Sequence, residues 1–143
     1  MKSFRVLTSG FHEISVRIKT VVPEALSKMA HELTERIRYN IETGYVTLGW
    51  PPRSEYTIRT YQMMGYPITE GLVLTGEMLS SVELRGHYPE YEIYIGFPSA
   101  IHEYGSADGK IPARPFVRPA LDSIRSDNPV IDKVRDLFGG LFK

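Results

Sequence analysis

Cysteine is absent from the 143 residues of this chain. Disulfide bonds, thiolate metal sites and a cysteine nucleophile are therefore excluded. The chain also lacks any apolar run near the roughly 20 residues that span a bilayer. Its first ten residues hold no apolar stretch long enough for a signal peptide. From these absences we expect no membrane association, and synthesis in a cytoplasm.

The chain also has no excess of either charge, because 17 Lys and Arg balance 17 Asp and Glu. Proteins that bind nucleic acid usually cluster basic residues against the phosphate backbone, and the overall balance does not favour such a role. Hydrophobic residues make up 42% of the chain, which is enough for a packed core. Since no internal repeat or linker is visible, we expect one domain over residues 1–143, with flexible ends at 1–10 and 139–143.

Two patterns near the start of the chain predict a strand and a long helix. Residues 11–19 alternate, which is typical of a half-buried strand. Pro23 suits a first helical turn, and Gly44 is a natural end for the helix that follows. Apolar residues recur along this helix at helical spacing and predict one buried stripe, namely Leu26, Met29, Ala30, Leu33, Ile37 and Ile41.

The rest of the chain is expected to form short elements. A helix from Ser54 to about Met64 ends at Gly65, and a capped turn lies at 75–79. A β-hairpin turns at 86–89, and its returning strand aligns residues 91, 93, 95 and 97 on one face. Short helices follow over 98–104, from 119 and from 129, the last carrying Ile131, Val134, Leu137, Phe138 and Leu141. The predicted class is α+β, with one long N-terminal helix packed on a mostly antiparallel β-sheet and short peripheral helices.

Motifs for catalysis or cofactors fail on their spacing. The His102-Glu103 pair lacks the second histidine that a metalloprotease helix needs at position 106, which is Ser106. We therefore interpret it as an ordinary pair on a surface helix. The loop 105–110 has three rather than four residues between its glycines, unlike a phosphate-binding loop. Trp50 is expected to cover the edge of the core. The sequence predicts no cofactor, no metal and no enzymatic activity.

One region carries a specific pattern. Residues 100–105 read AIHEYG, and residues 111–121 read IPARPFVRPAL after a short loop. Upstream, 74–82 read LTGEMLSSV and 49–52 read GWPP, with Arg53 where leucine is common. Together these segments resemble the signature of bacteriophage tail-completion and virion-morphogenesis proteins, a family that includes the Mu-like morphogenesis protein. The resemblance extends from about Pro23 to Ile124.

The resemblance implies a structural, non-enzymatic role at the neck of a tailed bacteriophage. Such a protein is expected to form a homo-oligomeric ring, of six copies, at the head-proximal end of the tail. Its partners would be other virion proteins, namely the tail tube or tail terminator and the head–tail connector. It would reside in the virion after assembly in the host cytoplasm. An alternative is a small nucleic-acid-binding module that contacts DNA. For the structural role, contact with nucleic acid is expected to be incidental at most.

The resembling block also suggests which residues make protein contacts. Prolines stiffen it before binding, which lowers the entropic cost of docking, and Phe and Arg are enriched in interfaces. The candidate interaction residues are Glu103, Tyr104, Ile111, Pro112, Arg114, Pro115, Phe116 and Arg118. A second interpretation stays open, in which Phe116 packs into the chain's own core and Arg114 caps nearby carbonyls. The two roles are compatible.

Overall fold

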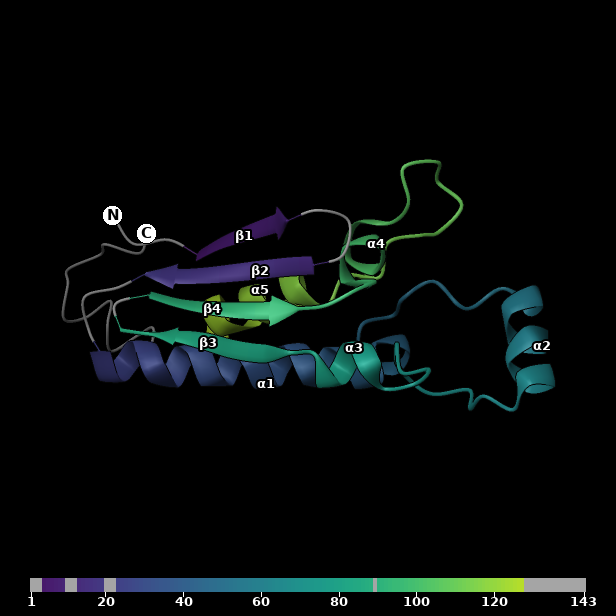
Figure 1. Ribbon diagram of the computed structural model, residues 1–143, viewed down its shortest axis with the longest axis horizontal. Helices are drawn as coiled ribbons and strands as arrows, with labels where there is room; N and C mark the ends of the chain where they lie inside the picture. The colour runs from purple at the N-terminus through teal and green to yellow at the C-terminus, as the bar shows by residue number, and fades with distance from the viewer. Residues whose placement is uncertain (1–3, 10–12, 20–22, 89, 128–143) are drawn as a thin grey trace.

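The computed structural model describes residues 4–9, 13–19, 23–88 and 90–127, with only the backbone described up to residue 19. The helices and strands follow in the order β1 (Phe4–Ser9), β2 (Glu13–Lys19), α1 (Pro23–Thr47), α2 (Glu55–Met64), α3 (Glu77–Ser80), β3 (Glu83–His87), β4 (Glu90–Ile95), α4 (Ser99–Tyr104) and α5 (Val117–Asp127). The predicted α+β class is confirmed: a long helix packs on an antiparallel sheet, with short helices around it (Figure 1). The helix expected from residue 129 and the flexible end at 139–143 lie outside the described residues.

The sheet has four strands in the order β1-β2-β4-β3, and each neighbouring pair is antiparallel. The predicted hairpin is β3–β4, although β3 continues through Gly86 and His87, which the sequence assigned to the turn. Strand β1 was not predicted, because residues 1–10 were expected to be a flexible end. Its sequence, FRVLTS, has Val6 and Leu7 side by side instead of a strict alternation, so the period-two signal of a half-buried strand is blurred.

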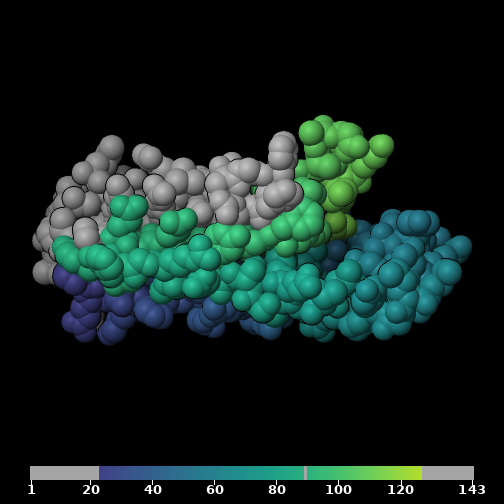
Figure 2. Space-filling model, in the orientation of Figure 1, coloured from purple at the N-terminus to yellow at the C-terminus, as the bar shows by residue number. Residues whose placement is uncertain are grey.

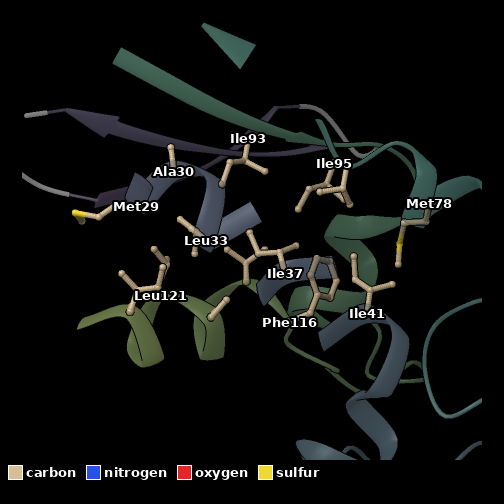
Figure 3. Close-up of a cluster of buried hydrophobic side chains, with 14 of the residues drawn as sticks. Met29, Ala30, Leu33, Ile37, Ile41, Met78, Ile93, Ile95, Phe116 and Leu121 are labelled. Atoms are coloured by element: carbon tan, nitrogen blue, oxygen red, sulfur yellow. The ribbon is translucent and has the colours of Figure 1, made fainter. Parts of the chain in front are cut away.

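The core lies between one face of the sheet and the two helices α1 and α5. Figure 3 shows side chains from α1, β4 and α5 meeting there. The predicted stripe of α1 is buried throughout, with Leu26, Leu33, Ile37 and Ile41 all fully buried. Burying one such aliphatic side chain stabilises the fold by about 1.5–3 kcal/mol. Burial of this stripe therefore holds α1 against the sheet.

The end of α1 differs from the prediction. Gly44 does not stop the helix, which continues to Thr47. Instead Gly44 is buried beneath the indole of Trp50, and a Cβ at this position would overlap the ring. Trp50 is 6% exposed and lies edge-on to Tyr45, with ring centroids 5.5 Å apart. The glycine thus makes room for the tryptophan that covers this end of the core, as expected for Trp50.

Two further boundaries are corrected. Strand β4 ends at Ile95, and Phe97 lies beyond it with 56% of its surface exposed, so it does not continue the core face. Helix α5 begins at Val117 rather than at Pro119. Proline is tolerated within a first helical turn, and α5 begins earlier because a buried carboxylate from α4 caps it. The predicted caps of α2, Ser54 and Gly65, are confirmed.

Candidate protein-interaction surface

Glu103 is the buried carboxylate that begins α5. The side chain is 6% exposed and accepts hydrogen bonds from the backbone N–H groups of Phe116 at 2.8 Å, Val117 at 3.0 Å and Arg118 at 3.1 Å. The first N–H groups of a helix have no partner within the helix, and a negative charge is favourable there. The expectation of a His-Glu pair on the surface is therefore wrong, because Glu103 joins α4 to α5 inside the protein.

Arg114 and Trp50 join two segments that are more than 60 residues apart. The guanidinium of Arg114 donates to the carbonyl oxygens of Pro51 at 3.0 Å and Pro52 at 3.1 Å. In the opposite direction, the Trp50 indole Nε1 donates to the Pro115 carbonyl oxygen at 2.8 Å. The GWPP segment and the PARPF segment, recognised separately in the sequence, thus form one clasp. Several carbonyl oxygens of the clasp are available as hydrogen-bond acceptors, because its prolines have no N–H and do not form a regular β-ladder.

The eight predicted interaction residues differ in how far they are buried. Phe116 is fully buried and Arg114 is 7% exposed, so these two, with Glu103, serve the fold itself. Phe116 is therefore no accessible anchor in this structure, and it packs in the chain's own core as the alternative expected. Arg114 does bond to carbonyls, but to those of Pro51 and Pro52 rather than to local ones. Pro115 is half-buried. Exposed surface remains at Tyr104, Ile111, Pro112 and Arg118, of which Ile111 and Pro112 line a groove described below.

His102 is the titratable group with the most perturbed surroundings. Burial lowers its pKa to about 4, because the charged imidazolium loses hydration, and the nearby Arg114 guanidinium lowers the pKa further. Its Nδ1 atom is buried without a hydrogen-bond partner. The ring is therefore neutral at pH 7 and acts there as a packing group.

Helix α2 projects from the end of the molecule as an arm (Figure 1). None of its residues is buried. Tyr56 is 80% exposed and Met63 is 89% exposed, and their spacing of seven residues places them on one face of the helix. Met64, beside them, is 62% exposed. Large apolar groups that gather on an exposed element are typical of an interaction surface. The sequence does not reveal this feature, because the apolar residues of the helix form no single continuous stripe.

Arg53 holds the base of this arm. Its guanidinium donates to the carbonyl oxygens of Thr69 at 2.9 Å and Gly71 at 2.6 Å, and it lies over the Tyr45 ring at 4.2 Å from the centroid. These contacts join the segments that enter and leave α2 across 16–18 residues. In addition, Ser54 accepts a hydrogen bond from the Thr57 N–H at 3.1 Å. The base of the arm is therefore tied to the segment that follows α2, while its apolar face stays in solvent.

A groove of about 670 Å³ opens between the arm and the loop that precedes α5. In Figure 2 it lies where the green lobe of the loop and the blue-teal lobe of α2 diverge. Its exposed apolar lining comes from Leu74, Phe97, Ile111 and Pro112, with Thr57 and Tyr61 of α2 on the arm side. Its lining holds one acidic side chain, Glu77, and three basic ones, Arg53, Lys110 and Arg114. This composition suits the apolar side chains of a polypeptide.

No group of three or more His, Asp and Glu among the described residues is arranged to hold a metal ion. Within the same part of the chain, no helix is long and apolar enough to cross a membrane.

Comparison with other proteins gives one informative relationship. No protein-family model matches the chain, and no solved structure matches it significantly. The uncharacterized protein MJ0331 of Methanocaldococcus jannaschii is 31% identical over 128 residues, which cover 81% of this chain and 94% of the relative. An alignment of that extent covers most of the chain rather than an isolated motif. The chain therefore belongs to the same protein family as MJ0331 of Methanocaldococcus jannaschii.

Proposed function

We propose that this protein is a structural component of a tailed virus particle, a tail-completion or neck protein that joins the tail to the head. It acts by binding other virion proteins and further copies of itself in a ring, without catalysis. The observation that carries the proposal is the projecting arm α2, which presents Tyr56 and Met63 to solvent at 80% and 89% exposure. A monomeric protein gains no stability from such an arrangement, whereas an assembly does.

The clasp supports the same proposal in a different way. The segments that resemble the tail-completion signature, GWPP and PARPF, are joined by Trp50 and Arg114. These contacts hold the base of the arm and one wall of the groove in place. The two segments therefore both form part of the exposed surface and support it. A structural protein that must present a fixed shape to its neighbours requires this, because preformed surfaces bind with less loss of conformational entropy.

The alternative, a nucleic-acid-binding module, has less support. Five basic side chains of the described residues already pair with acidic neighbours: Arg36 with Glu32, Arg38 with Glu35, Arg59 with Glu55, Arg85 with Glu83 and Lys110 with Asp108. Binding to phosphates needs several cations that converge on one surface. We therefore expect no measurable affinity for duplex DNA at physiological salt.

The proposal is tested in the genome that carries this reading frame. Deleting the frame should yield filled heads and separate tails that do not join, and the protein should appear in purified intact particles by mass spectrometry. Complementation with the unaltered gene should restore joined particles. Intact infectious particles that form without this polypeptide would refute the proposal. Strict monomers that bind duplex DNA and no virion protein would favour the alternative.

A further inference from the structure

We propose that the arm of one copy inserts into the groove of the next copy, so that Tyr56 and Met63 of α2 pack against Leu74, Phe97 and Ile111 of its neighbour. This inference rests on the proposed function and names the contact that would close the ring. Such a contact joins two different patches of the chain, and repeated contacts of this kind close into rings when the rotation allows.

The two faces of α2 explain why the occupant is another copy. Thr57 and Tyr61, four residues apart, line the chain's own groove. Tyr56 and Met63 lie on a different face of the helix, because a helix turns by about 100° per residue. The arm therefore forms a wall of its own groove with one face and cannot insert its outer apolar face there. A neighbouring copy supplies the groove that the outer face needs.

The groove and the arm also match in size and chemistry. A volume of about 670 Å³ lies within the roughly 300–1,000 Å³ of sites that enclose a drug-sized molecule, which is comparable to a few large side chains. The apolar groups exposed on each side, Tyr56 and Met63 against Phe97 and Ile111, would be removed from water together. Methionine adapts its shape to irregular apolar surfaces.

Charges set the orientation of the same contact. The arm carries Glu55 and Arg59, paired at 3.7 Å and highly exposed. The groove lining carries Glu77 and Lys110, the latter 3.5 Å from Asp108. Its other two cations, Arg53 and Arg114, are engaged with carbonyl oxygens of their own chain. Insertion allows Arg59 to approach the neighbour's Glu77 and Glu55 to approach its Lys110. Exposed pairs of this kind add orientation and association rate more than affinity. The chain's balanced charge also means that copies do not repel one another.

The expected strength of a single contact is modest. Ten helical residues against one groove bury less than the roughly 800 Å² per partner of a standard stable interface. Each subunit makes the contact twice in a closed ring, once through its arm and once through its groove. Assembly should therefore depend steeply on concentration, and covalent trapping is the appropriate readout.

Because the chain has no cysteine, introduced cysteines report the contact without background. We would mix the single variants M63C and I111C, oxidise mildly, and separate the products by non-reducing electrophoresis. The expected result is a disulfide dimer in the mixture at least tenfold above that in either variant alone. The double variant M63C/I111C should give a ladder of trimers and larger species. As a matched control, V46C carries a cysteine at an exposed position of α1 (67% exposed) outside the arm and should not cross-link to I111C.

Two outcomes would overturn the arm-in-groove contact while leaving the proposed function in place. One is M63C alone forming dimers as readily as the mixture, because arms would then meet arms on a two-fold axis. The other is no cross-link in the mixture at concentrations where mass measurement shows an oligomer, which places the ring contact elsewhere. If the chain stays monomeric at every concentration and with virion proteins, the contact and the proposed function fail together.

Discussion

Replacing Glu103 by alanine removes the one carboxylate that accepts the three N–H groups at the start of α5. Two of these groups, on Phe116 and Val117, belong to fully buried residues, so water cannot replace the lost acceptor. An unsatisfied buried donor costs about 1–3 kcal/mol, and hydrogen bonds to a charged group contribute about 1.5–3 kcal/mol each. These terms are not additive within one network. We expect Glu103→Ala to lower the free energy of unfolding by about 3–5 kcal/mol.

The glutamine variant separates the role of the acceptor from that of the charge. Glu103→Gln keeps one carbonyl oxygen, which can accept from Phe116 and Val117, but it places an NH2 group against the Arg118 N–H. It also loses the negative charge at the helix N-terminus, worth up to about 2 kcal/mol in partly buried positions. The expected loss for Glu103→Gln is about 1–2 kcal/mol. Against a typical stability of about 5–15 kcal/mol, the alanine variant should be severely weakened and the glutamine variant should stay folded.

The assay is urea unfolding followed by far-UV circular dichroism and by tryptophan fluorescence. Trp50 is the only tryptophan, and its indole bonds to the Pro115 carbonyl beside Phe116, so its emission reports the same region. Glu42→Ala, an exposed carboxylate on α1, is the control and should change stability by no more than about 0.5 kcal/mol. A loss below 1 kcal/mol for Glu103→Ala, or a loss for Glu103→Gln that equals it, would refute the reasoning.

Three further predictions address the surroundings of the candidate surface. The folded-state pKa of His102, about 4, lies below the unfolded value, so stability is lost as pH falls below about 6.5. Between pH 7 and pH 5, the free energy of unfolding in urea titrations should therefore fall by about 1–2 kcal/mol less for His102→Gln than for the unaltered protein, given about 1.4 kcal/mol per pKa unit. Equal decreases for the two proteins would contradict this. Gly71→Ala should destabilise the fold by at least about 2 kcal/mol in the same assay, because a Cβ would overlap the Ile41 carbonyl oxygen. A variant of unchanged stability would show that the backbone at Gly71 is not packed tightly against α1. Arg53→Met should raise amide hydrogen exchange in α2 at least tenfold while leaving exchange in α1 unchanged, since only the base of the arm loses its hydrogen bonds; uniform exchange throughout would contradict a local role.

The sequence predicted the parts of the fold that local patterns govern. The stripe from Leu26 to Ile41, the caps Ser54 and Gly65, and the β3–β4 hairpin all follow from periodicity or from the conformational preference of single residues. The same reasoning failed for Gly44 and for β1. Gly44 carries the ordinary signal for a helix end, but the tertiary requirement for space beneath Trp50 overrides it.

The candidate site shows a similar division. The resemblance to the tail-completion signature singled out Arg114, Phe116 and Glu103, and the enrichment of Phe and Arg in interfaces supported two of them. The sequence left open whether Phe116 and Arg114 turn inward, and it did not indicate that Glu103 is buried. These orientations depend on the carbonyls of Pro51 and Pro52 and on the start of α5, which lie elsewhere in the sequence. The exposed arm was missed for the converse reason. Tyr56 and Met63 look like ordinary helix residues until the fold leaves that helix without a core to pack against.

The sequence by itself determined the class of fold, the position of its main helix and the two segments that form the clasp, because periodicity and proline restrict the backbone locally. Only the tertiary structure decided which groups of those segments face inward and which remain in water. Burial depends on contacts between residues far apart in the chain, and a local pattern carries no information about those distant residues. In this protein, such contacts determine whether an arginine or a phenylalanine supports the fold or lies on the surface.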